Sequence, residues 1–115
     1  MLGPLEAEVM QVMWSSGERL SVRAMLSRLN EGRQPSLAYT TVMTVMARLA
    51  DKEILRRELN GRGYEYEAAV PDAASIAVRG VLRDFGDAAI AGFVDEARAD
   101  PKLRRRLEHL LRNGR

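Results

Sequence analysis

The sequence contains no cysteine, and this absence excludes several kinds of chemistry. A chain without thiols forms no disulfide, holds no metal ion through thiolates and has no cysteine nucleophile. Histidine is nearly absent as well, because His109 is the single one and lies in a charged, helix-like segment. No glycine-rich phosphate-binding loop occurs either. We therefore expect no metal site, no cofactor and no enzymatic activity.

Long hydrophobic runs are also missing, although 46% of the residues are hydrophobic. A membrane-spanning helix needs about 20 consecutive apolar residues, so we expect no membrane association. The first ten residues contain Glu6 and Glu8 but no basic residue, which does not fit a signal peptide. Together with the absence of cysteine, these features predict a cytoplasmic protein.

The sequence also lacks a strong excess of charge of one sign. The net charge is +2, from 18 basic and 16 acidic residues. Residues 1–70 carry nine of each sign, and residues 71–115 carry nine basic and seven acidic residues. Any argument for nucleic-acid binding must therefore rest on where the charges lie, and not on their sum.

Three helices are predicted before residue 52. Apolar residues recur every three or four positions from Leu5 to Met13, from Val22 to Leu29 and from Val42 to Leu49. This spacing is typical of helices with one buried face. Pro4 suits the first turn of the first helix, and Ser21 suits the N-cap of the second. The six methionines fall at helical spacing and are interpreted as core residues.

Beyond the third helix, the pattern changes to alternation of apolar and polar residues. Residues 55–60 and 64–67 alternate, and the turn sequence Asn60-Gly61-Arg62-Gly63 lies between them. Glycine and asparagine supply the positive φ that a hairpin loop needs, so we predict a β-hairpin at about residues 55–67.

Three helices followed by a hairpin predict a mainly α fold, a winged helix-turn-helix, over residues 1–70. In this fold the third helix, here about residues 38–51, enters the DNA major groove, and the hairpin wing contacts the flanking DNA. The third helix is rich in β-branched residues, which are mediocre helix formers. Threonine is nevertheless short, exchanges hydrogen bonds and offers a methyl group to thymine. We predict that it forms part of a DNA-binding set: Tyr39, Thr40, Thr41, Thr44, Arg48, Lys52 and Arg62.

Roles within this set follow from position along the helix. Thr41 and Thr44 are predicted to contact bases, and Arg48 to reach a guanine edge or a phosphate. Tyr39 and Thr40, at the helix start, would bind phosphate together with the helix N-terminus. Lys52 extends the contact with the DNA backbone, as Arg56 also could, and Arg62 at the hairpin tip can enter a minor groove.

Other interpretations of the same residues stay open. Arg56 and Arg57 could pair with Glu65 and Glu67 across the hairpin, and Tyr64 and Tyr66 could simply pack on the sheet. The whole unit could be a winged-helix protein-interaction module that never binds DNA. Such a module would more readily expose leucine or phenylalanine on its third helix, where this sequence has threonines.

Residues 71–115 are predicted to be helical. Asp72 can cap a helix, Gly86 interrupts it, and Asp100-Pro101 begins a last helix. The many apolar residues of this short region exceed what it can bury alone, so we predict a homodimer. The alternative is that the region folds back onto the winged unit. The predicted dimer contacts, with Ile90 as a further apolar residue, are Ile76, Val81, Leu82, Phe85, Phe93, Leu103, Leu107 and Leu110.

The segments LGPLEAEVMQVMWSSG, SVRAMLSRLN and LAYTTVMTVMARLADKEILRRELNGRGYEYEAAV resemble the penicillinase repressor family, which includes copper-operon repressors, over roughly residues 2–70. The resemblance implies a bacterial, cytoplasmic repressor that dimerises through C-terminal helices and binds a palindromic operator with TACA/TGTA half-sites. It also implies base contacts by Thr41, Thr44 and Arg48, supported by Tyr39, Thr40 and Arg62.

Two departures from the family pattern concern regulation. Penicillinase repressors are cleaved at an Asn-Phe bond in the C-terminal region, and the nearest counterpart here is Gly92-Phe93. The resemblance therefore leaves a regulatory protease partner open. Copper-responsive relatives carry paired cysteines, which this chain lacks, so metal sensing of that kind is not expected.

Overall fold

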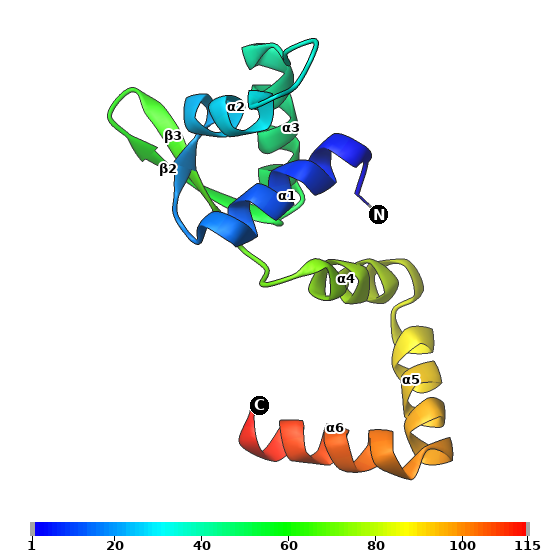
Figure 1. Cartoon of the computed structure of the whole chain (residues 1–115). Helices are drawn as coiled ribbons and strands as arrows, with labels where there is room; N and C mark the ends of the chain where they lie inside the picture. The colour runs from blue at the N-terminus through cyan, green and yellow to red at the C-terminus, as the bar shows by residue number, and fades with distance from the viewer. Residues whose placement is uncertain (1, 115) are drawn as a thin grey trace. The chain divides into compact units, whose positions relative to one another are not determined.

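Three helices open the fold in the computed structural model, which describes residues 2–114 (Figure 1). They are α1 (Pro4–Ser16), α2 (Val22–Asn30) and α3 (Tyr39–Asp51). Gly17 ends α1 with a φ of 65°, which glycine adopts without strain. Ser21 caps α2 as predicted, because its hydroxyl accepts a hydrogen bond of 3.1 Å from the Ala24 backbone N–H.

A three-stranded antiparallel sheet completes this unit. Its strands are β1 (Leu20–Ser21), β2 (Leu55–Asn60) and β3 (Gly63–Ala68), in the order β1-β3-β2. The prediction of a hairpin alone was incomplete, because Leu20 pairs with Tyr66 and thereby adds β1 to it. A strand of two residues is too short to show alternation in the sequence.

The loop between β2 and β3 is shorter than predicted. Asn60 pairs with Gly63, so the loop consists of Gly61 and Arg62. Gly61 has a φ of 65° and Arg62 does not have positive φ, a pattern that favours glycine at the first loop position. The wing is defined here as residues 55–68. Arg62 therefore lies at its tip, in the loop between the two strands.

The core of this unit is formed by the inner faces of the three helices, β1 and the bases of β2 and β3. Met10, Met13, Met25 and Met46 are buried in it, as predicted. The prediction is wrong for Met43, which is 42% exposed, and Met1 lies outside the described residues. Helical geometry turns Met43 about 120° away from the buried Leu49, so its spacing from Met46 alone was misleading.

The C-terminal region forms the predicted helices α4 (Ala73–Phe85), α5 (Asp87–Ala99) and α6 (Pro101–Asn113). Asp72 and Asp100 cap α4 and α6 through hydrogen bonds of 2.8–3.3 Å from backbone N–H groups. Gly86 separates α4 from α5 with a φ of 55°. The chain divides into one unit that ends at Ile76 and another that begins at Ala77.

The second unit buries little of its apolar surface. Ala97 is its one buried hydrophobic residue among those described. Nine large apolar side chains in this unit are exposed, and they are Val78, Val81, Leu82, Phe85, Ile90, Phe93, Val94, Leu110 and Leu111. Within the described part of the chain, no helix has both the length and the apolar character needed to cross a bilayer.

Candidate nucleic-acid interface

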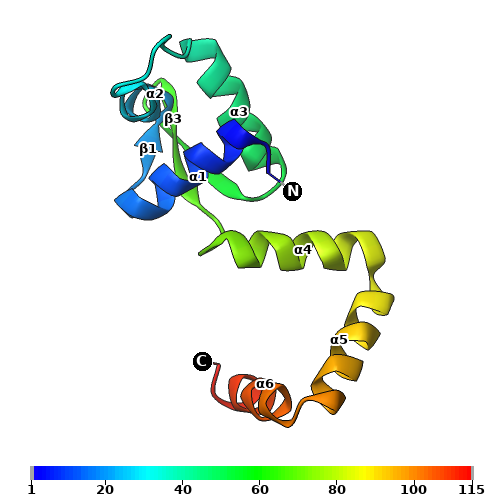
Figure 2. The same ribbon diagram turned by 45° about the vertical axis from the view of Figure 1, so that its right-hand side comes forward.

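The outward face of α3 carries the candidate interface. Val42, Met46 and Leu49 are fully buried, and this packing offsets the modest helix propensity of the β-branched residues. The helix packs against α1, α2 and β2 and runs along the outside of its unit (Figure 2). All seven predicted DNA-binding residues are exposed. Six of them lie on α3 or directly after it, and Arg62 lies apart at the end of the wing.

Two parallel rows of side chains cover the outward face of α3. Residues four apart lie above one another on a helix. Thr40, Thr44 and Arg48 therefore form one row, which we call the polar ridge. Tyr39, Met43 and Ala47 form the neighbouring row, which we call the apolar ridge. Sequence reasoning predicted that all three residues of the polar ridge contact DNA, but it grouped Thr41, and not Thr40, with Thr44 and Arg48, and it assigned Met43 to the core.

The side of α3 next to α2 holds a stacked pair. The Arg23 guanidinium of α2 lies over the Tyr39 ring, 5.6 Å from its centroid. Arg23 was missed by sequence reasoning, because only the packing of α2 against α3 brings it to the start of α3. Its cation and the N-terminus of α3 together favour an anion at this place.

The side of α3 next to α1 holds an ion pair. Lys52 Nζ donates a hydrogen bond of 3.0 Å to Glu6 Oε2, and the other Glu6 oxygen accepts one of 2.9 Å from the Gly3 backbone N–H. Burial by itself raises the pKa of Glu6, but the Gly3 hydrogen bond and the charges of Lys52 and Arg48 lower it overall. Lys52 is thus partly neutralised within the protein.

Several of the wing's charges are also paired within the unit. Arg56 and Arg19 both lie 3.3 Å from Glu67, which confirms cross-strand pairing for Arg56. Arg57 instead lies over the Tyr64 ring at 4.8 Å. Tyr66 is buried in the sheet as predicted, whereas Tyr64 is exposed.

Two of the predicted contacts keep their charge available. Among the described residues, neither Arg48 nor Arg62 forms an ion pair. Of the cations predicted to bind DNA, these two arginines are therefore the ones that break no ion pair when they bind phosphate or a base edge.

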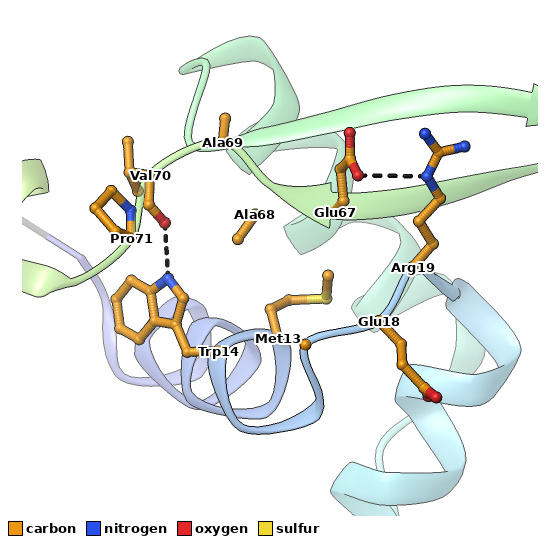
Figure 3. A pocket seen from close by; sticks show the side chains of 10 residues that line it. Met13, Trp14, Glu18, Arg19, Glu67, Ala68, Ala69, Val70 and Pro71 are labelled. Carbon is orange, nitrogen blue, oxygen red and sulfur yellow. Dashed lines mark hydrogen bonds and ion pairs between the residues drawn. The ribbon is translucent and has the colours of Figure 1, made fainter.

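A pocket of about 410 Å³ lies elsewhere in the unit, between the end of α1 and the end of β3 (Figure 3). The Trp14 indole N–H donates a hydrogen bond of 2.9 Å to the Val70 carbonyl at its edge. Glu18, Arg19 and Glu67 supply its charged groups. None of the predicted DNA-binding residues lines this pocket.

The predicted dimer contacts are mostly uncovered in the single chain. Val81, Leu82, Phe85, Phe93 and Leu110 are exposed, and Leu103 and Leu107 are half-buried. Ile76 differs from these, because it packs against the core of the winged unit.

Comparison with known proteins matches the sequence of this chain to a family of repressors. A sequence profile described as penicillinase repressor matches residues 2–113. Two proteins called transcriptional regulator BlaI, from Mycobacterium tuberculosis strains CDC 1551 / Oshkosh and ATCC 25618 / H37Rv, are 43% identical over 65 residues. This match covers 56% of the chain and 46% of each relative, so it spans about half the length of those relatives.

A solved structure shares the fold. It is the solution structure of the monomeric form of Bacillus licheniformis BlaI in complex with the blaP half-operator. The TM-score is 0.51 at 23% identity, and the match covers 64% of this chain and 85% of that one. At this identity the likeness concerns the fold alone, and it agrees with the winged helix-turn-helix that the sequence predicted.

Proposed function

The chain belongs to the penicillinase repressor family, and from this membership we propose that it is a sequence-specific DNA-binding transcriptional repressor. It binds a palindromic operator as a homodimer, with α3 in the major groove of each half-site. The observation that carries the proposal is the polar ridge. Two threonines and Arg48, which forms no ion pair with any residue from 2 to 114, project from a helix that its unit leaves uncovered on this side.

Each group has a role in this proposal. Thr41, Thr44 and Arg48 read base edges, because hydroxyl and guanidinium groups match the donors and acceptors of the major groove. Tyr39, Thr40 and the stacked Arg23 hold a phosphate at the start of α3. Lys52 adds a contact with the DNA backbone by binding a phosphate on the side of its amine that faces away from Glu6.

The wing contributes through its tip. Arg62 lies at the end of the hairpin and enters the minor groove next to the half-site. The other wing arginines are held by Glu67 or by Tyr64, so they contribute less.

The C-terminal unit supplies the dimer contact. Its exposed apolar side chains would be covered by the same residues of a second copy, and a two-fold dimer matches a palindrome. Ile76 is left out because it packs against the core of the winged unit. The contacts are then the other predicted residues: Val81, Leu82, Phe85, Phe93, Leu103, Leu107 and Leu110. The dimer blocks transcription by occupying its operator.

A second candidate function is protein binding through the same helix. The exposed Tyr39 and Met43 on α3 favour it, because tyrosine and methionine are enriched in protein interfaces relative to the rest of the surface. It predicts no preference for any DNA sequence.

Fluorescence anisotropy separates the two candidates. The full chain is titrated into a labelled duplex with a TACA/TGTA palindrome and into a scrambled duplex, each at several salt concentrations. Tight binding to the palindrome, with a salt slope that reports several phosphate contacts, supports the repressor. Equal, weak binding to both duplexes calls for selection from random DNA, and failure to enrich any site there favours the protein-interaction module.

A further inference from the structure

We propose that Met43 contacts the 5-methyl group of a thymine in the operator and so helps to determine sequence specificity. The proposal rests on the proposed function, because it requires α3 to lie in the major groove. It assigns the apolar ridge a role that neither composition nor helical periodicity indicated.

The position of Met43 supports this role. Its side chain is 42% exposed, and it lies in the middle of the apolar ridge, one turn after Tyr39 and one turn before Ala47. The polar ridge runs beside it, so a base pair under Thr44 has Met43 at one side. Ala47 is too short to hold the helix away from the groove.

Chemistry then selects the base that fits. In the major groove, thymine presents a methyl group beside its O4 acceptor, whereas the other three bases present only hydrogen-bond donors or acceptors. A thioether has no donor and only a weak acceptor, so against a polar base edge it would leave groups unpaired. An unbranched methionine also adapts its shape to a small apolar target. The polar ridge therefore recognises polar base edges through its hydroxyl and guanidinium groups. The apolar ridge recognises a thymine methyl group through Met43.

The test removes that methyl group alone. An operator site is first selected from random DNA with the full chain, and each thymine in one half-site is then replaced by deoxyuridine. This exchange deletes the 5-methyl group and keeps the base pair. The wild-type protein should lose about fourfold in affinity at one thymine, the effect of removing one methyl-sized apolar contact. Met43→Gln, which keeps the length of the side chain, should bind the thymine and deoxyuridine forms of that site equally.

A matched control uses another exposed apolar residue. Leu59→Gln alters the wing and not α3, so it should keep the fourfold discrimination at the same thymine. Circular dichroism checks that both variants are folded.

Three outcomes overturn the proposal. In the first, no thymine replacement changes affinity. In the second, Met43→Gln keeps the full discrimination at every position. In the third, Leu59→Gln removes the discrimination as well, which would place its origin outside α3. Failure to select any site refutes the repressor function itself, whereas a selected site without coupling to Met43 refutes only this inference.

Discussion

Replacing Glu6 by Gln is expected to strengthen operator binding. In the free protein, Glu6 holds Lys52 through a hydrogen bond of 3.0 Å. A phosphate bound by Lys52 would lie about 3 Å beyond the amine, so the Glu6 carboxylate would stand about 6 Å from that phosphate. Coulomb's law with water-like screening gives a repulsion of about 0.7 kcal/mol at this separation. Glutamine removes the charge and still accepts the hydrogen bond from the Gly3 backbone N–H, so the helix start is retained.

Affinity should therefore rise about threefold per half-site at low salt, and the gain should shrink above about 0.2 M salt as the charges are screened. Fluorescence anisotropy with the selected operator at 50 and 300 mM salt measures this. The control is the same substitution in a Lys52→Gln background, where the gain should be smaller. Unchanged affinity of a folded Glu6→Gln protein at low salt would refute the reasoning, because Lys52 would then not approach a phosphate.

Further predictions concern the other parts of the molecule. Arg48→Ala should weaken operator binding by about 1–3 kcal/mol and unequally across operator variants, whereas Arg62→Ala should cause a smaller loss of sequence preference; anisotropy on an operator panel distinguishes them. Phe85 is 66% exposed, so Phe85→Asp should leave the helices formed but give monomers in sedimentation velocity; an intact dimer would exclude α4 from the interface. Met46→Ala should lower the free energy of unfolding by about 2–5 kcal/mol, because Met46 is fully buried, and thermal unfolding measures the loss. The folded-state pKa of Glu6 lies below its unfolded value, so its contribution to stability is present above the unfolded pKa and is lost as the pH falls through the folded one. Circular dichroism measures the pH midpoint of acid unfolding. This midpoint should therefore lie at lower pH for Glu6→Gln than for the wild type, when the two proteins are compared under conditions that give them the same free energy of unfolding at neutral pH.

The helices and the wing could be predicted because each is specified by local residues. Gly17, Ser21, Asp72 and Asp100 end or begin helices through their own backbone angles and hydrogen bonds. These signals need no knowledge of the rest of the fold, so periodicity and capping residues were sufficient.

The features that sequence reasoning missed depend on contacts between distant segments. β1 exists because Leu20 lies beside Tyr66, and the stack of Arg23 on Tyr39 exists because α2 lies beside α3. The ion pair between Glu6 and Lys52 joins two residues that lie 46 positions apart in the sequence. Met43 was misassigned for a related reason, since the neighbouring elements decide which face of a helix is buried, and they leave the side chain of Met43 exposed.

The scarcity of buried apolar residues in the second unit has a consequence for gene regulation. In the homodimer proposed above, this unit would cover its hydrophobic surface through a second copy, and it would gain stability by mass action. At low concentration the amount of dimer then rises with the square of the amount of chain, so operator occupancy responds steeply to synthesis and degradation. Monomeric chains would expose Phe85 and Phe93 to cellular proteases. Degradation of these monomers would make operator occupancy depend still more steeply on the amount of chain.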